Sequence, residues 1–301
     1  MIRSYDHYDY DAATLVERKG GQRISVCLPA RDEEATVADI VTAVREQLVE
    51  RVPLVDELLV IDDHSTDATA ERASAAGACV IDAAEVLRDI ATGPGKGSAL
   101  WRSLHISTGD IVVWCDTDVT NFSPQFVVGL IGPLLDEPDL VYVKGFYRRP
   151  LGTTSDGGGR VTELVARPLL ALLHPSLTSI VQPLSGEYAG RRHALEQVPF
   201  VAGYGVEMGL LIDLAARFGT DAMAQVDLGT RRHRNRPLVE LGPQATTIMQ
   251  VAMRRASPDF VPEKVLLERP DAPPVTVSAE ELPPLLSVRE YLLRHHSADA
   301  P

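Results

Sequence analysis

Short apolar runs rich in β-branched residues alternate with longer amphipathic stretches through the first third of this chain. The sequence predicts strands at residues 24–28, 57–61, 79–81 and 111–115 and helices at 34–50, 66–76 and 98–107. Strand–helix alternation in steps of roughly 30 residues is typical of a parallel sheet with right-handed crossovers. We therefore predict an α/β fold with a Rossmann-like first half.

The alternation is less regular beyond Pro124. Helices are predicted at 125–135 and 207–218, and strands at 140–146 and 225–228. The last 36 residues are rich in proline, which breaks regular structure, until a short helix predicted at 288–296. We expect a proline-rich linker and a C-terminal helix over residues 266–301.

The composition limits which partners this chain could bind and where in the cell we expect it. The net charge of −13 argues against nucleic acid or an anionic membrane as a partner. No apolar stretch approaches the roughly 20 residues that a membrane span needs, and the first residues lack the apolar core of a signal peptide. We expect a cytoplasmic protein. Cys27, Cys79 and Cys115 match neither a disulfide framework nor a zinc site, so we expect small core residues.

Two carboxylates, Asp116 and Asp118, follow the buried-strand pattern at 111–115. A strand that ends in this way delivers its carboxylates to the carboxyl edge of the sheet, where α/β proteins bind ligands. Hard oxygen ligands there suit Mg²⁺ or Mn²⁺ bridging a diphosphate. A solvated turn or a helix cap is the simpler alternative for an isolated Asp-x-Asp.

The first two predicted strands also end in acidic segments, one with Glu33 and one with Asp63. A carboxylate at such a position could hold a ribose hydroxyl or a base edge, or only cap the next helix. Because parallel strands end at the same edge of a sheet, we expect all three strand ends to meet at one crevice.

A glycine-rich turn at 93–97 contains Lys96 but lacks the glycine and serine or threonine spacing of an ATPase phosphate loop. Lys96 at a helix start is well placed to neutralise a diphosphate, or it is a surface lysine on a flexible turn. Glu207 lies where a loop becomes a helix, and it either caps that helix or binds sugar hydroxyls. His233 is either a solvated loop histidine or a metal ligand beside Asp118.

Arginines stand out against the acidic background of the second half. Residues 157–159 are three glycines before Arg160, which suits a backbone anion site or a hinge. Many arginines in an acidic protein suggest a site for a phosphate or carboxylate. The residues concerned are Arg148, Arg149, Arg160, Arg167, Arg191, Arg192, Arg231, Arg232, Arg234 and Arg236.

Together these motifs resemble a known family. The segment 28–34, the acidic second strand end, Pro-Gly-Lys-Gly and Asp-x-Asp resemble GT-A glycosyltransferases. The segments 146–150, 157–168, 182–188 and 233–237 are more specific, and they resemble the glucosyl-3-phosphoglycerate synthases over residues 21–242. The resemblance implies retaining transfer of glucose from a nucleoside-diphosphate glucose, with UDP-glucose as the usual donor, to the 2-hydroxyl of 3-phospho-D-glycerate, in a homodimer.

The resemblance also implies residue roles. Asp118 and His233 would bind Mg²⁺ or Mn²⁺, and Gly159, Arg160, Thr162 and Asn235 would bind the acceptor. On physical grounds we expect Lys96 and Arg231 to stabilise the charge that develops on the leaving diphosphate. We hypothesise a front-face reaction in which the Leu184 carbonyl helps place the sugar, in place of a carboxylate nucleophile such as Glu207. The nucleotide sugar would contact Pro29, Ala30, Glu33, Asp63, Lys96, Asp116, Thr117, Tyr204 and Glu207.

Several alternatives remain open on the sequence. A close relative of this family transfers mannose from GDP-mannose to the same acceptor. A transferase acting on a polyprenyl phosphate, a sugar-nucleotide pyrophosphorylase and a nucleotide-sugar sensor share the first half of the fold. On the resemblance we divide the chain into an N-terminal extension (1–22), a nucleotide-sugar-binding half (23–124), an acceptor-binding half (125–265) and the linker with its helix (266–301).

Overall fold

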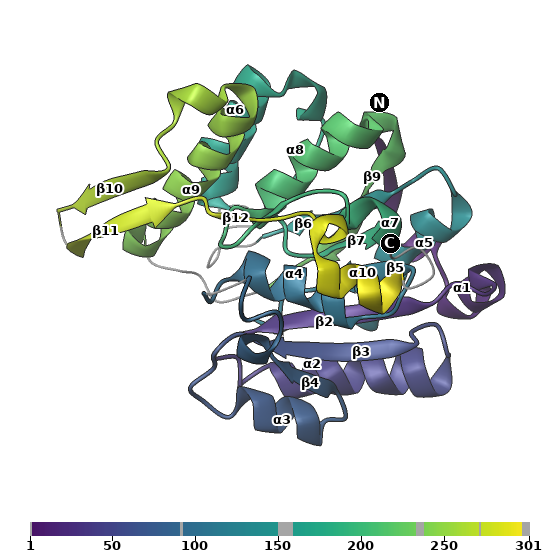
Figure 1. The fold of residues 1–301 in the computed structure, drawn as a ribbon. Helices are drawn as coiled ribbons and strands as arrows, with labels where there is room; N and C mark the ends of the chain where they lie inside the picture. The colour runs from purple at the N-terminus through teal and green to yellow at the C-terminus, as the bar shows by residue number, and fades with distance from the viewer. Residues whose placement is uncertain (1, 91–92, 150–158, 233–237, 271, 297–301) are drawn as a thin grey trace.

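A mostly parallel sheet runs through the centre of the molecule (Figure 1). The computed structural model describes residues 2–90, 93–149, 159–232, 238–270 and 272–296. The eight strands lie in the order β1-β9-β6-β7-β5-β2-β3-β4, and only the pairs that include β7 are antiparallel. The predicted α/β fold is confirmed. The strands are β1 (Arg3–Asp6), β2 (Ile24–Ala30), β3 (Glu57–Asp62), β4 (Cys79–Asp82), β5 (Ile111–Trp114), β6 (Tyr142–Arg148), β7 (Tyr188–Arg191) and β9 (Met223–Thr230).

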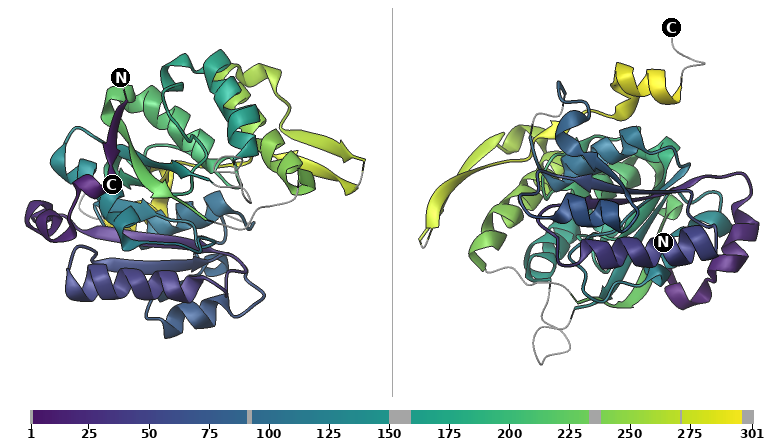
Figure 2. Two further views of the ribbon diagram at one scale, coloured as in Figure 1. Left: turned by 180° about the vertical axis from the view of Figure 1, so that it is seen from behind. Right: turned by 90° about the horizontal axis from the view of Figure 1, so that it is seen from below.

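Both faces of the sheet are covered by helices (Figure 2). Alternation along β5 explains this, because Ile111 and Val113 enter one core while Val112 and Trp114 enter the other. The first core is closed by α1 (Ala12–Lys19), α2 (Val37–Val44), α3 (Thr69–Ala75) and α5 (Pro124–Asp136). The second is closed by α4 (Lys96–Ile106), α6 (Arg167–Leu173), α7 (Arg192–Leu195), α8 (Val206–Phe218), α9 (Leu238–Ala256) and α10 (Arg289–His295).

The predicted strands and helices of the first half are all present, with shifted ends. The helix expected over 34–50 begins at Val37 and continues beyond Val44 as a π-helical segment, η2 (Arg45–Arg51). The cysteine prediction is wrong at one position, because Cys27 and Cys115 are buried whereas Cys79 is exposed. Cys79 begins β4, the last strand at that edge of the sheet, where one side is open.

Both ends of the chain contribute strands that the sequence patterns did not predict. The N-terminal extension contributes β1, which pairs with β9 in parallel, Arg3 opposite Ala224. The expected proline-rich linker is wrong over its first part, where β10 (Lys264–Arg269) and β11 (Ala272–Ser278) form a hairpin that extends away from the body of the molecule (Figures 1 and 2). A two-stranded ribbon tolerates proline because each strand has an open edge, and the register shifts opposite Pro273 and Pro274.

The C-terminal helix is confirmed as α10. Before it, β12 (Glu281–Leu282) pairs with β8 (Phe200–Val201), which brings the tail back to the body. None of the helices built from the described residues combines the length and apolarity that a membrane span requires.

Candidate active site

A cavity of about 290 Å³ lies at the carboxyl ends of β2, β3 and β5. Its lining includes the last two residues of β2, one residue that follows β2, one that follows β3 and three that follow β5. The predicted meeting of three strand ends at one crevice is therefore confirmed. These residues are Pro29, Ala30, Glu33, Asp63, Asp116, Thr117 and Asp118.

The second half of the chain supplies most of the other walls. Eight further candidates from the sequence line the same cavity, namely Lys96, Gly159, Arg160, Thr162, Leu184, Tyr204, Glu207 and Arg231. His233 and Asn235, predicted to bind metal and acceptor, lie outside the described residues. Arg149, one of the arginines expected at an anion site, also lines the cavity, and so do three residues of α9 that no sequence pattern singled out, Leu241, Gln244 and Ile248.

Lys96 is the first residue of α4 and joins the two halves of the site. Its Nζ lies 2.5 Å from Asp116 Oδ1 and 2.6 Å from Glu207 Oε1, in the first turn of α8. The preceding turn is fixed because Gly95 N–H donates to Asp63 Oδ2 at 2.8 Å. Gly95 has φ of 147°, and a Cβ there would lie 2.5 Å from the Ala202 carbonyl, so a larger residue does not fit. The glycine-rich turn thus delivers a cation to the strand ends.

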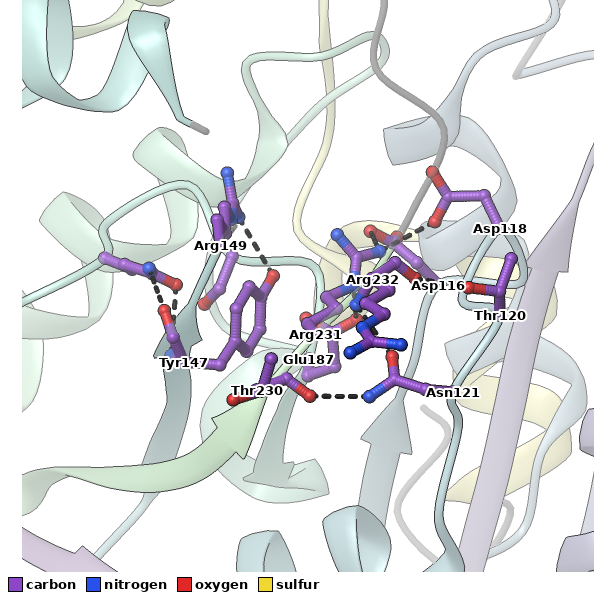
Figure 3. A network of polar contacts seen from close by, with 12 residues as sticks. Asp116, Asp118, Thr120, Asn121, Tyr147, Arg149, Glu187, Thr230, Arg231 and Arg232 are labelled. Atoms are coloured by element: carbon purple, nitrogen blue, oxygen red, sulfur yellow. Dashed lines mark hydrogen bonds and ion pairs between the residues drawn. The ribbon is translucent and has the colours of Figure 1, made fainter. Parts of the chain in front are cut away.

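Arg231, just after β9, contacts three carboxylates (Figure 3). One nitrogen, Nη2, lies 2.8 Å from Asp116 Oδ2 and 2.7 Å from Asp118 Oδ1. Nε lies 2.9 Å from Glu187 Oε1, an ion pair without the alignment of a hydrogen bond. The guanidinium also lies over the Tyr147 ring, 5.3 Å from its centre. Arg231 therefore ties both carboxylates of the Asp-x-Asp motif to the second half.

The charges of the site stabilise one another. Burial alone would raise the pKa of Asp116, but Lys96 and Arg231 hold it well below its usual range. Burial alone would lower the pKa of Lys96, yet Asp116 and Glu207 raise it above its usual range. Lys96 is therefore a cation and Asp116 an anion at neutral pH.

Glu187 also belongs to the site, because it pairs with Arg231, although no sequence pattern gave it a role. It is fully buried, and burial raises its pKa although the nearby Arg231 opposes this. The preceding Gly186 lies directly against Asp116, where a Cβ would come within 2.0 Å of Oδ2. Both residues lie in a segment that enters β7, a short strand without a clear periodic signal. A close backbone contact of this kind leaves no mark in the sequence except the glycine.

The middle residue of the Asp-x-Asp motif is held by the backbone of β2 and by a hydroxyl at the start of α2. Thr117 Oγ1 donates to the Pro29 carbonyl at 2.8 Å, and the Thr117 carbonyl accepts a hydrogen bond from Thr36 Oγ1 at 2.5 Å. Thr117 is 3% exposed despite lining the cavity. Its side chain therefore fixes the turn that presents Asp116 and Asp118.

The arginines of the second half differ in what they contact. Arg149, Arg160 and Arg231 line the cavity, as expected for an anion site. The expectation is wrong for Arg191 and Arg192, whose guanidinium groups donate to backbone carbonyls, among them Leu140 at 2.8 Å and Gly109 at 2.7 Å. These two arginines satisfy loop carbonyls around the start of β5 and the end of α5, which sequence alone does not distinguish from ligand binding.

The carboxylates of the site fit a hard divalent cation. Among the described residues, no three His, Cys, Asp or Glu side chains form a ready-made metal cluster. Mg²⁺, however, is commonly held by one or two carboxylates together with substrate phosphates and water. Asp116 and Asp118 line the cavity facing Lys96, which suits an ion that arrives with a diphosphate.

Comparison with known proteins places this site in a family. The model for "Glycosyl transferase family 2" matches residues 25–198. A glucosyl-3-phosphoglycerate synthase of Petrotoga mobilis is 41% identical over 97% of this chain and 95% of the relative, and one of Mycolicibacterium paratuberculosis is 51% identical over 84% and 78%.

Solved structures agree with the sequence relatives. A crystal structure of glucosyl-3-phosphoglycerate synthase from Mycobacterium tuberculosis in complex with Mn²⁺, UDP-glucose and phosphoglyceric acid superimposes with a TM-score of 0.87. The identity is 46%, and the match covers 96% of this chain and 99% of that one. Another structure of the Mycobacterium tuberculosis enzyme, in complex with Mg²⁺ and UDP, has a TM-score of 0.86. The chain belongs to glycosyl transferase family 2 and, within it, to the glucosyl-3-phosphoglycerate synthases.

Proposed function

We propose that this protein transfers glucose from UDP-glucose to the 2-hydroxyl of 3-phospho-D-glycerate, with retention at the anomeric carbon. One observation carries the proposal. The carboxylates of the Asp-x-Asp motif and the cations Lys96 and Arg231 line a single cavity with Arg149 and Arg160. A nucleotide-sugar diphosphate and a small doubly anionic acceptor both find complementary charge there. The relatives named above are glucosyl-3-phosphoglycerate synthases, and one of them was solved with UDP-glucose and phosphoglyceric acid.

The nucleotide-sugar half would bind the donor. Pro29, Ala30, Glu33 and Asp63 would contact the nucleoside, and Asp116 with Thr117 the ribose. Asp118 and His233 would hold a Mg²⁺ or Mn²⁺ ion, which when bound neutralises charge on the leaving diphosphate. Lys96 and Arg231 would stabilise the same developing charge with fixed positive groups that need no rearrangement.

The acceptor-binding half would hold the sugar and the phosphoglycerate. Tyr204, which is 43% exposed, and Glu207 would face the glucose. Gly159, Arg160, Thr162 and Asn235 would bind the acceptor, and Arg149 on the same wall adds positive charge. We add Arg149 to this set because an acceptor with a phosphate and a carboxylate calls for more than one guanidinium.

Retention would proceed on one face of the sugar. The leaving phosphate oxygen would accept the proton of the acceptor hydroxyl while the Leu184 carbonyl holds the sugar in place. Glu207 is the nearest carboxylate for the alternative, a covalent intermediate. Its ion pair with Lys96 at 2.6 Å favours a binding role, since that pair lowers its readiness to attack carbon.

An end-point assay tests the proposal. The purified protein is incubated with Mg²⁺, 3-phosphoglycerate and either UDP-glucose or GDP-mannose, and release of nucleoside diphosphate is measured with and without the acceptor. We expect acceptor-dependent release from UDP-glucose. Release from GDP-mannose alone would change the donor and product but keep the fold and acceptor. Equal release with and without the acceptor would contradict the assignment of an acceptor site to the second half of the chain.

We also propose that two copies associate through the lobe formed by α6, α9 and the hairpin. Both α6 and β11 pack against α9, and this lobe exposes large apolar side chains at Leu172, Leu238, Met249 and Leu266. Light scattering should give twice the chain mass for the wild type and a lower mass for Leu266→Glu. The matched control is Leu293→Glu on α10, which is also exposed but lies outside the lobe. A wild-type monomer would refute the dimer.

We propose a cytoplasmic location, since both substrates are phosphorylated metabolites and the acidic chain has no evident affinity for an anionic membrane. Cell fractionation tests this directly. Recovery of the activity in the membrane fraction after a salt wash would contradict it.

A further inference from the structure

The side chain of Lys144, on β6, has no part in the reaction proposed above. It is 1% exposed, and its Nζ donates to the Ser185 carbonyl at 2.8 Å and lies 4.3 Å from the centre of the Tyr188 ring. Both partners are neutral. Because burying an amine without a carboxylate partner is costly, this lysine calls for a reason beyond packing.

The segment that Lys144 contacts, residues 182–187, forms part of the active site. Leu184 lines the cavity, Gly186 lies against Asp116, and Glu187 pairs with Arg231. Strand β6 holds both ends of this segment. Gln182 Nε2 donates to the Tyr147 carbonyl at 2.5 Å, and Gly145 N–H donates to the Glu187 carbonyl at 2.8 Å. Lys144 bonds the Ser185 carbonyl in the middle of the segment, next to Leu184.

We propose that Lys144 is a positioning residue for glucose transfer, which fixes the Ser185 carbonyl and thereby sets the place of the Leu184 carbonyl and of Gly186 against Asp116. The inference rests on the proposed function. A shift of the segment would move the Leu184 carbonyl relative to the sugar. Asp116, which the donor would contact, is itself held by Lys96 and Arg231, so donor binding should change little. Transfer depends on placement at this scale, since a displacement of about 1 Å can cost about 100-fold in rate.

The charge of Lys144 provides a signature that a merely structural lysine would lack. Burial lowers the pKa of Lys144 to about 7. A protonated amine makes a stronger, charge-assisted hydrogen bond to the Ser185 carbonyl than a neutral one. The hold on the segment is therefore strongest below that pKa and weakens as pH rises through it. The charged groups that act on Lys144 are Glu207 on α8, Lys96 on α4, Glu187 before β7 and Asp116 after β5.

The experiment compares Lys144→Met and Lys144→Gln with the wild type. Transfer from UDP-glucose to 3-phosphoglycerate is measured from about pH 6 to about pH 8.5, with the affinity for UDP and the melting temperature measured in parallel. Lys19→Met is the matched control, because Lys19 is 8% exposed and bonds Asp56 Oδ2 at 2.6 Å outside the cavity. It is expected to lower the melting temperature without changing kcat.

We expect Lys144→Met to lower kcat by about 10- to 100-fold, with the affinity for UDP changed by less than about 3-fold. Lys144→Gln keeps an N–H donor but cannot titrate, so it should recover part of kcat and lose the decline near pH 7 seen in the wild type. Titration of the substrates is common to all variants and cancels in this comparison. If the methionine variant does not fold, the glutamine variant decides alone.

A folded Lys144→Gln with wild-type kcat and a wild-type pH profile would overturn the inference. So would a loss of activity matched by an equal loss of UDP affinity, because that result places Lys144 in donor binding. A wild type without acceptor-dependent transfer would instead refute the proposed function. That outcome is read from the wild-type assay and is separate from any variant.

Discussion

The two halves of the molecule hold their cations in different surroundings. In the nucleotide-sugar half, Lys96 starts a helix, its side chain is 15% exposed, and it faces the cavity between Asp116 and Glu207. In the acceptor-binding half, the Arg231 side chain is 4% exposed and one of its partners, Glu187, is fully buried. One cation is available to a ligand, whereas the other is also part of the packed interior.

Positive charges in one site can therefore serve two purposes, ligand binding and stabilisation of the fold. A cation whose two carboxylate partners both line the cavity can exchange them for a diphosphate at little cost to the fold. A cation that neutralises a fully buried carboxylate cannot be removed without leaving that charge uncompensated, which is strongly destabilising. Removing each cation in turn should therefore separate activity from stability.

Arg231→Met should have the largest effect. We expect a loss of about 100- to 1000-fold in kcat, because a fixed charge on the leaving diphosphate is removed. The free energy of unfolding should fall by roughly 3–5 kcal/mol as Glu187 loses its partner. Steady-state kinetics and urea denaturation measure the two effects. Arg232→Met is the control, because Arg232 is the exposed neighbour of Arg231. Unchanged stability in Arg231→Met would show that Arg231 does not support the packed interior.

Lys96→Met should reduce kcat by a comparable factor, about 100-fold or more, but with less damage to the fold. Its partners line a cavity that water can enter, and Asp116 keeps its contact with Arg231. We expect a loss of about 1–3 kcal/mol in unfolding free energy. A destabilisation equal to that of Arg231→Met would show that the two cations are not different in kind.

Glu207→Gln tests the carboxylate that faces Lys96. As a binding residue it should lose about 10- to 100-fold in kcat, the value of one charge-assisted hydrogen bond. Mass spectrometry of the variant incubated with UDP-glucose should detect no glycosyl-enzyme. A trapped covalent adduct would contradict the front-face reaction.

Gly186→Ala tests the close contact between the two halves. The added Cβ would lie 2.0 Å from Asp116 Oδ2, which Lys96 and Arg231 prevent from moving away. We expect a loss of about 10- to 100-fold in kcat, because the segment that carries Gly186 and the Leu184 carbonyl must move instead. Gly21→Ala is the matched control, since a Cβ there meets no atom within 4 Å. Full activity in Gly186→Ala would show that the contact can relax.

The same contrast explains what could be predicted from the sequence. The strand ends of the first half were predictable because each combines a local apolar run with polar residues at a fixed place, as with Asp116 and Asp118. Glu187 and Gly186 were not, because their role arises from an antiparallel strand inserted between β5 and β6. Nothing near Glu187 in the sequence indicates that it will meet Arg231.

Two further errors have the same origin. Arg191 and Arg192 look like ligand-binding arginines in sequence, yet tertiary contacts place them on backbone carbonyls. The prolines after Lys264 predict a linker, but a hairpin that pairs only with itself has open edges that accept them. In each case long-range pairing, absent from any local pattern, decides the outcome.

The smallest effect is expected in the C-terminal tail, at residues that do not line the cavity. The hydroxyl of Tyr291, on α10, donates to Glu196 Oε2 at 2.6 Å, and Tyr291 is fully buried. Tyr291→Phe should lower the unfolding free energy by about 1–3 kcal/mol because Glu196 loses a buried partner. Its kcat should be unchanged, since neither residue lines the cavity. Tyr8→Phe, at an 80% exposed tyrosine, is the control. A loss of kcat in Tyr291→Phe at unchanged stability would mean that α10 affects the active site. The activity would then depend on more than the different surroundings of Lys96 and Arg231.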